Sequence, residues 1–292
     1  TGDLDDHAEI VWHEYGTWES RHSGPRATIC NMTADEPSSA NTTAWSDSDL
    51  KANPHTTADK AGRVRRMFDS IAGRYDLNNR LHSLGRDQAW RRRTAKAAVL
   101  GPDDRVLDVA CGTGDLIEAI AARRPGSVHA VDFSEGMLDV ARTKSTRRAR
   151  RPGVPMPTYD HGDAMHLALD DESFDACTIA FGIRNVTDPL TAIREFHRVL
   201  APGGRCLILE FSEPANPLLR IMSNFYNRHI MPVTATLIAG DRSGAYKYLP
   251  RSMETFLTPG ELADHMKEAG FDSLSHQPMT GGICTLTIGR KA

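Results

Sequence analysis

The sequence predicts an α/β fold, a doubly wound sheet of seven strands with a C-terminal antiparallel hairpin, and three observations predict it. Short apolar runs alternate with helix-forming segments beyond residue 60. The first of these runs breaks into Gly112-Thr-Gly114 before a helical segment, which is the junction where an α/β sheet binds a nucleotide-like ligand. Only Thr280-Gly-Gly282 separates the last two runs, so the final strand is expected to turn back as the second arm of a hairpin.

An apolar stripe predicts the helix that precedes the sheet, because residues from Val64 to Tyr75 follow the i, i+3, i+4, i+7 and i+11 spacing of one helix face. Asp188-Pro189 offers an N-cap and a first-turn proline for a later helix, which Pro202-Gly-Gly204 is expected to end. Thr258-Pro259 opens another helix that ends at Gly270. The strands are expected at residues 105–110, 127–132, 157–160, 175–181, 204–211, 272–278 and 283–290.

The glycine turn raises the question of which cofactor it binds. A dinucleotide fold wants a small residue three positions after Gly114, and this chain has Ile117 there. Asp115 would repel a pyrophosphate and suits a ligand with positive charge, such as the sulfonium and ammonium of S-adenosylmethionine. Asp132 ends the second strand and is placed to accept both hydroxyls of an adenosine ribose. That carboxylate would bind the ribose of NAD equally well. The alternative without any ligand is that the glycines form a structural turn and that Asp132 is a solvated acid.

Charge and composition divide the chain near residue 60. Residues 1–60 hold 11 Asp/Glu against 4 Lys/Arg, whereas the remainder is mildly basic. Because this first stretch is rich in small polar residues and lacks periodicity, it is predicted to be an acidic, disordered extension. Residues 61–292 are predicted to form the α/β domain, with residues 61–100 as a helical lid. Three of the four tryptophans nevertheless lie in the extension (Trp12, Trp18 and Trp45), which fits either a docking segment or a true start at Met32.

The sequence favours a cytoplasmic protein without a metal. No basic stretch followed by an apolar core opens the chain, so no secretory signal is expected. The five cysteines are odd in number, widely spaced and free of any CxxC, which predicts reduced thiols and no zinc site. The longest apolar run is about half of the roughly 20 residues that a membrane span requires, so any membrane contact is expected to be peripheral.

The cofactor segments resemble those of class I S-adenosylmethionine-dependent methyltransferases. The shared order is a glycine turn, an acid at the end of the next strand, and Asp163-Ala164 before a further strand. In that family these acid-containing segments hold ribose and adenine, and the C-terminal hairpin is a hallmark. The resemblance therefore implies S-adenosyl-L-methionine as cofactor.

Four segments carry a narrower resemblance that runs from about Val64 to the C-terminus. Besides the glycine turn, they are Phe68-Asp-Ser-Ile-Ala72 with Tyr75-Asp76, then Ala180-Phe-Gly-Ile-Arg-Asn-Val186, and finally the stretch from Arg198 to Ser212 that ends in Glu-Phe-Ser. Together they resemble the UbiE/MenG family of quinone-biosynthesis C-methyltransferases. The glycine turn is common to many methyltransferases, and the Phe-Gly-Ile-Arg-Asn and Glu-Phe-Ser segments are the specific ones.

The chain departs from that family's pattern at several positions on the substrate side: Asn78, His82, Asp87, Ala201 and Cys206. On the cofactor side, Ala180 stands where the family has a serine thought to contact the cofactor. The cofactor-binding positions that the resemblance implies are Gly112, Thr113, Gly114, Asp132, Asp163, Ala164 and Ala180.

The resemblance implies methyl transfer to a ring carbon of a prenylated quinol, most specifically demethylmenaquinol giving menaquinol. Such a carbon becomes nucleophilic when the neighbouring hydroxyl loses its proton, and Arg184 is the candidate catalytic residue that would favour the phenolate. The equal alternative for Arg184 is an ion pair that holds the loop after the fourth strand. Tyr246 and Tyr248 are candidate substrate-binding residues, with plain packing as their alternative.

The alternatives are a prenylated benzoquinol as substrate, in ubiquinone biosynthesis, or a non-catalytic cofactor-binding protein. No nucleic-acid partner is expected, because the body is only mildly basic and has no basic patch interleaved with aromatic residues. Since the quinol has a long apolar tail, Pro217 to Ala239 is a candidate for peripheral membrane contact at the inner face of the membrane. The other interpretations of that stretch are a homodimer face or buried helices.

Overall fold

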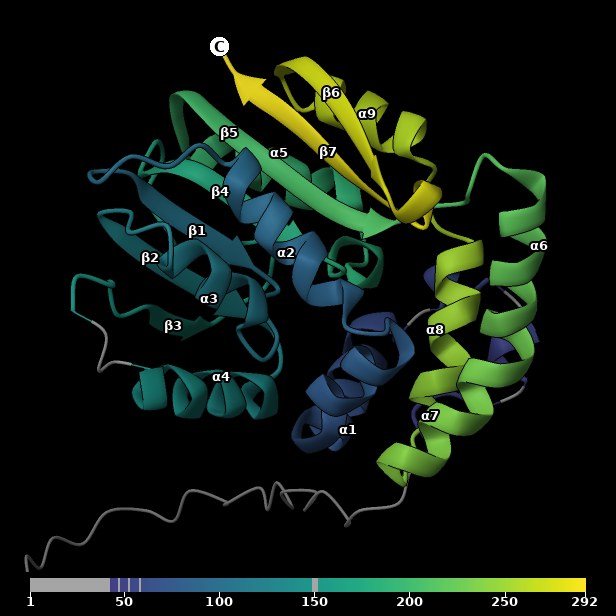
Figure 1. Ribbon diagram of the computed structural model, residues 1–292. Helices are drawn as coiled ribbons and strands as arrows, with labels where there is room; N and C mark the ends of the chain where they lie inside the picture. Colours follow the sequence, from purple (N-terminus) through teal and green to yellow (C-terminus); the bar gives the residue numbers. More distant parts are fainter. Residues whose placement is uncertain (1–42, 47, 52, 58, 149–151) are drawn as a thin grey trace, which may run out of the picture. The chain divides into compact units, whose positions relative to one another are not determined.

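The structure is a computed structural model that describes residues 43–46, 48–51, 53–57, 59–148 and 152–292, and Figure 1 shows it as a ribbon. A seven-stranded sheet has the order β3-β2-β1-β4-β5-β7-β6, in which β7 runs in the direction opposite to the other six strands. The strands are β1 (Arg105–Val109), β2 (Ser127–Asp132), β3 (Thr158–His161), β4 (Phe174–Ala180), β5 (Leu200–Phe211), β6 (Phe271–Met279) and β7 (Cys284–Lys291). The predicted fold class and C-terminal hairpin are confirmed.

Helices cover both faces of the sheet. One face packs on α2 (Arg86–Ala97), α3 (Asp115–Ala121) and α4 (Glu135–Arg148), and the other packs on α5 (Pro189–Val199) and α9 (Pro259–Glu268). The apolar stripe of α5 explains its position, because Ile193 and Phe196 lie one turn apart and are fully buried against the strands. Burial of each such side chain contributes roughly 1.5–3 kcal/mol to folding.

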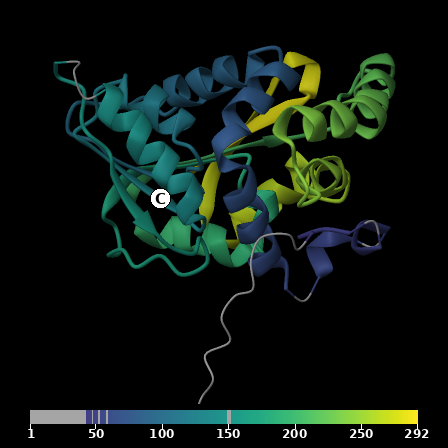
Figure 2. The same cartoon turned by 90° about the horizontal axis from the view of Figure 1, so that it is seen from below.

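A further layer of helices lies beside the sheet rather than on its faces. It consists of α1 (Lys60–His82), α6 (Pro217–Phe225), α7 (Met231–Ala239) and α8 (Ala245–Glu254), with the π-helical turn Tyr226–Ile230 joining α6 to α7. Figures 1 and 2 both show these helices grouped beside the C-terminal ends of the strands. They share a core of their own, formed by the buried face of α1, the inner residues of α7 and α8, and Trp45. Within this layer, α1 is the helix that covers the site described below.

The predicted elements agree with the structure except at the start of the fifth strand. The α5 helix ends at Val199, and β5 begins at once with Leu200, which pairs with Phe174. The pairing then skips to Ala176 and Arg205, so the prediction that Pro202-Gly-Gly204 ends the helix is wrong. These residues instead form an irregularity within the strand, where Gly203 has a φ of +78° that few other residues adopt.

The sequence-based boundary at residue 60 divides the chain differently from the structure. Trp45 is 1% exposed and stacks on Tyr248 of α8, with ring centroids 4.5 Å apart. Residues 43–57, where described, therefore pack on the domain, and residues 59 and 60 are the N-cap and the first residue of α1. Residues 1–42, 47, 52 and 58 of the predicted extension lie outside the described residues. Among the described residues, no helix is both long and apolar enough to cross a membrane.

Candidate functional site

The glycine turn follows β1 at the carboxyl edge of the sheet. Gly112 and Gly114 have φ values of +56° and +81°, a region of backbone space that favours glycine. A Cβ on Gly114 would come within 3.3 Å of the Cβ of Ala141, so this glycine allows α3 and α4 to approach. A Cβ on Gly112 would meet no protein atom within 4 Å, which leaves open space for a ligand against the backbone.

Asp132 is fixed at the end of β2 by backbone donors. Its Oδ2 accepts the amide N–H of Gly112 at 2.7 Å, and its Oδ1 accepts that of Ser134 at 2.8 Å. Burial raises the pKa of Asp132 to about 6, and those two hydrogen bonds oppose the rise. At neutral pH the site therefore presents a buried carboxylate with lone pairs left for a ligand's hydroxyl groups.

Asp115 lines the pocket described below and is also bonded to polar side chains of the protein. Its carboxylate accepts hydrogen bonds from Lys144 Nζ at 2.5 Å, Arg80 at 3.1 Å and Gln88 at 2.9 Å. Burial alone would raise the pKa of Asp115, but the charge and hydrogen bond of Lys144, the charge of Arg91 and the hydrogen bond from Arg80 lower it. The negative charge is therefore already paired within the protein.

The turn is also tied to α1, which closes over it. The Thr113 hydroxyl donates to Asp76 Oδ1 at 2.5 Å, and Lys144 Nζ reaches the other oxygen of Asp76 at 2.8 Å. Because Lys144 also binds Asp115, one ammonium group joins α4 to both α1 and the start of α3. This network holds the lid helix against the turn.

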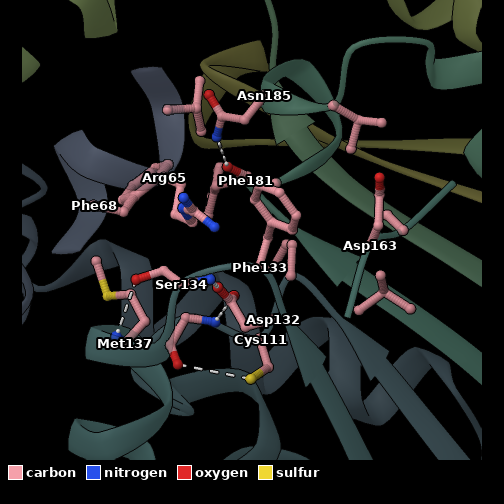
Figure 3. A pocket seen from close by; sticks show the side chains of 18 of the residues that line it. Arg65, Phe68, Cys111, Asp132, Phe133, Ser134, Met137, Asp163, Phe181 and Asn185 are labelled. Atoms are coloured by element: carbon pink, nitrogen blue, oxygen red, sulfur yellow. Dashed lines mark hydrogen bonds between the residues drawn. The ribbon is translucent and has the colours of Figure 1, made fainter. Parts of the chain in front are cut away.

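A pocket opens between the glycine turn, α1 and the loop after β4, and it spans about 940 Å³ of space free of atoms, part of which is open to solvent. Figure 3 shows side chains from several elements around this space. Its polar wall includes Asp132 and Asp163, whereas Phe68, Phe133 and Phe181 provide flat apolar surfaces. An acidic wall beside aromatic faces suits a ligand that combines a nucleoside with an apolar ring.

Six of the seven predicted cofactor positions line this pocket. They are Gly112, Thr113, Asp132, Asp163, Ala164 and Ala180. Gly114 does not line it, because it faces α4. The Asp163 side chain accepts the backbone N–H of Met165 at 2.9 Å, which fixes the loop that also carries Ala164.

Arg184 does not line the pocket, and its side chain is 5% exposed. One guanidinium nitrogen donates to Glu210 Oε1 at 2.9 Å and to the carbonyl of Phe181. The pKa of Glu210 is raised by burial even though the charge of Arg184 opposes the rise. This geometry matches the alternative left open by the sequence, an ion pair that holds the loop after β4.

Tyr246 and Tyr248 also lie outside the pocket, on the buried face of α8. The Tyr246 hydroxyl accepts a hydrogen bond from Asn78 at 2.7 Å, which joins α8 to α1. The Tyr248 hydroxyl donates to Asn185 Oδ1 at 3.1 Å. Since Asn185 does line the pocket, Tyr248 supports the wall instead of forming it.

A buried lysine holds the same loop from the other side. Lys60 Nζ donates to the carbonyls of Arg184 at 3.0 Å and Val186 at 2.6 Å, and it contacts His55 Nδ1 at 3.1 Å. Burial lowers the pKa of Lys60 to about 8. His55 in turn contacts the Ser252 carbonyl through Nε2 at 3.1 Å, so the segment before α1 braces the pocket loop against α8.

Sequence reasoning assigned no site role to several residues that line the pocket. Arg65, Phe68 and Tyr75 reach it from α1, and Phe133 follows Asp132 directly. The Arg65 guanidinium lies over the Phe133 ring, 5.7 Å from its centroid (Figure 3). The sequence position of Phe133, directly after the acid that ends β2, could have identified it as a pocket residue. Which α1 residues line the pocket depends on how that helix is rotated about its axis. The sequence pattern does not predict this rotation.

Comparison with known proteins places this site in context. The model of the ubiE/COQ5 methyltransferase family matches residues 56–291. A protein of Geobacter sp. (strain M21) named ubiquinone/menaquinone biosynthesis C-methyltransferase UbiE is 42% identical, over 81% of this chain and all of its own length. A demethylmenaquinone methyltransferase of Deinococcus radiodurans is also 42% identical, over 80% of this chain and 94% of its own.

Solved structures of lower identity share the fold. A SAM-dependent methyltransferase of Thermotoga maritima superposes with a TM-score of 0.52 at 20% identity, covering 78% of this chain and all of that one. A chain from a complex of the Haloferax volcanii Trm112 activator with a methyltransferase gives a TM-score of 0.55 at 16% identity, covering 76% of this chain and 96% of that one. The fold is therefore that of class I methyltransferases.

Proposed function

The chain belongs to the ubiE/COQ5 methyltransferase family, and from that premise we propose that it methylates a ring carbon of a prenylated quinol with S-adenosylmethionine as methyl donor. The preferred substrate is demethylmenaquinol, which gives menaquinol. The observation that carries the proposal is the pocket itself, where the buried Asp132 carboxylate lies opposite the aromatic side chains of Phe68 and Phe181.

The residues present fit the proposed cofactor. The free space over Gly112 accommodates close approach to the backbone, and the Asp132 carboxylate would accept the ribose hydroxyls. Asp163 and Phe133 would hold the adenine, by accepting its amino group and by contacting its face. S-adenosylmethionine, when bound, supplies an electrophilic methyl group.

The protein's own contribution to the chemistry would be alignment and control of the quinol's charge. A quinol hydroxyl that loses its proton to water makes the adjacent ring carbon nucleophilic. The pocket would align that carbon with the methyl group that the cofactor supplies, and the ring proton that the methyl group replaces would also leave to water. Asn185 reaches the pocket from the loop after β4. We assign Arg184 the role of positioning this loop through Glu210, since its guanidinium is already bonded there.

The substrate's tail extends the proposal to the membrane. A quinol with an isoprenoid chain resides in the bilayer, so we propose peripheral contact between the protein and the membrane surface, with Pro217–Ala239 as the contacting segment. Tyr246 and Tyr248 are proposed to support the substrate wall from behind, because their hydroxyls bond to Asn78 and Asn185.

The decisive experiment supplies methyl-labelled S-adenosylmethionine with chemically reduced short-chain demethylmenaquinol or demethoxy-benzoquinol. The oxidised quinones serve as controls, because they have no hydroxyl proton to lose. Label in the reduced naphthoquinol alone supports the proposal. Label only in the benzoquinol assigns the enzyme to ubiquinone biosynthesis, and cofactor binding without any transfer favours a non-catalytic role.

A further inference from the structure

The segment Pro217–Ala239, which we call the outer arm, exposes an unusual amount of apolar surface. Neither α6 nor the π-helical turn contains a buried residue. Leu218, Ile221 and Phe225 are 67%, 66% and 59% exposed. The α7 helix buries only Met231 and Ala235. Such a helix gains no stability from its apolar face unless something else covers it.

A second group of exposed leucines lies on the neighbouring helix. Leu77 and Leu81 are on α1, and Leu84 follows in the turn, with exposures of 52%, 49% and 89%. The outer arm packs beside α1, because Asn78 donates to the Ala235 carbonyl and His82 contacts the Tyr226 hydroxyl at 2.7 Å. In the described part of the chain, ten of the twelve large apolar side chains that are exposed belong to these two groups.

The charges around this surface indicate what covers it. The outer arm contains no Asp or Glu, while Arg220, Arg228 and His229 are interleaved with its apolar residues. The two arginine side chains remain 44% and 57% exposed although each has a carboxylate neighbour outside the arm. Apolar residues interleaved with cations suit an anionic lipid surface. A two-fold dimer would bring the same cationic patch against itself, which is unfavourable.

The same surface lies close to the pocket. The outer arm begins soon after β5, at the carboxyl edge of the sheet (Figure 1). The pocket is lined by residues at the carboxyl ends of β1, β2 and β4, which meet at the same edge. The α1 helix contributes to both regions, because Phe68 and Tyr75 line the pocket, whereas Leu77 and Leu81 lie further along the helix on its other, solvent-exposed face. A ligand that contacts both regions would therefore have its ring in the pocket and an apolar tail that extends past the end of this helix to the exposed leucines.

We propose that the outer arm, together with Leu77, Leu81 and Leu84, is the surface by which this protein rests on an anionic lipid bilayer. The assignment deepens the proposed function, on which it rests for the identity of the substrate. The tail of a prenylated quinol stays in the lipid while its ring enters the pocket. The apolar side chains enter the interfacial region, and the arginines lie at the level of the lipid headgroups.

The test measures binding of the full chain to vesicles of phosphatidylglycerol mixed with phosphatidylcholine, and to vesicles of phosphatidylcholine alone. In the test variant, Leu218→Gln, Ile221→Gln and Phe225→Gln are combined, because all three side chains are exposed and their loss leaves the core intact. Met156→Gln is the matched control, since Met156 is 50% exposed but lies between α4 and β3. We expect the triple variant to bind the anionic vesicles at least about tenfold more weakly, with the control unchanged.

Methylation of a tail-less quinol in solution separates this proposal from the proposed function, and the triple variant should retain that activity. If the natural chain binds anionic vesicles no better than the triple variant does, the surface is wrongly assigned. A wild-type dimer that the triple variant converts to a monomer would assign the surface to a second copy instead and overturn the proposal. If vesicle binding is lost as expected but no quinol is methylated, the proposed function fails while the lipid surface stands.

Discussion

The two walls of the pocket are held in different ways. The wall that we propose to hold the cofactor, called the cofactor wall below, is built from residues near one another at the edge of the sheet. Backbone N–H groups of Gly112 and Ser134 fix Asp132 directly. The opposite wall depends on segments far apart in the chain, such as Lys60 and Val186, joined through buried polar side chains. Substitutions in the first wall should therefore weaken ligand binding, whereas substitutions in the second should weaken the fold as well.

Among the substitutions that test this contrast, removal of the Arg184 side chain should have the largest effect on stability. Arg184→Met leaves the buried Glu210 carboxylate without its partner, which is expected to lower the free energy of unfolding by about 3–5 kcal/mol. Urea denaturation measures that loss. The double variant Arg184→Met with Glu210→Leu removes both charges, and we expect it to recover most of the stability.

The same double variant decides the role of Arg184. If the side chain only positions the loop, turnover of the reduced quinol should recover together with stability. A stable double variant whose kcat is still lower by about 100-fold or more would instead assign Arg184 to the stabilisation of the phenolate.

Trp45→Ala should destabilise the protein by about 3 kcal/mol, because it removes a fully buried ring that stacks on Tyr248. The affected wall is again the one made from distant segments. Thermal or urea unfolding measures the loss, and Trp45→Phe is the matched control because it keeps an aromatic ring at the same place. Equal stability of the alanine variant and the natural chain would show that the packing of Trp45 on Tyr248 contributes nothing to the fold.

Asp132→Asn should lower cofactor affinity by about 10- to 100-fold, because a hydrogen bond to a charged group is worth about 1.5–3 kcal/mol. Calorimetric titration with S-adenosylmethionine measures the change. Asp160→Asn is the control, since Asp160 is an exposed acid on the adjacent strand, outside the pocket. A similar loss in both variants would contradict the assignment.

The pH dependence of that affinity follows from the same carboxylate. Since the pKa of Asp132 in the folded protein is raised to about 6, the carboxylate is protonated as the pH falls through that value. A ligand whose hydroxyls donate to the ionised form should bind progressively more weakly below about pH 6. Affinity that stays constant between pH 7 and pH 5 would argue against a contact between the ligand and Asp132.

The smallest predicted effect concerns His55, which braces Lys60. Burial, followed by the charge of Lys60, lowers the pKa of His55 to about 4. The unfolded chain therefore takes up a proton near pH 6.5 while the folded protein does not, so stability should fall as the pH drops from 6.5 towards 4. After discounting for solvent screening, we expect a loss of about 1 kcal/mol at pH 5.

Comparison of two variants isolates this histidine. His55→Gln should show a weaker decline of unfolding free energy between pH 7 and pH 5 than the natural chain does. His166→Gln should keep the original decline, because the side chain of His166 is 80% exposed. Identical pH profiles for all three proteins would exclude His55 as a source of the acid sensitivity.

The sequence by itself determined the sheet and the cofactor wall. The turn from Gly112 to Gly114, the acid at the end of β2 and the hairpin through Thr280-Gly-Gly282 are local patterns. Their positions follow from strand order, because the carboxyl ends of parallel strands meet at one edge. Six predicted cofactor residues therefore came together in the pocket without any knowledge of how the covering helices pack.

Only the tertiary structure decided which residues complete the opposite wall. Arg184 and Asn185 are adjacent in the sequence, yet one bonds to Glu210 and the other lines the pocket. Likewise, Trp45 lies in an acidic, polar stretch that predicts disorder, but Tyr248 offers it a buried partner. These outcomes depend on contacts between residues separated by up to about 200 positions. Composition and periodicity describe local preference, and they do not specify which distant side chains meet.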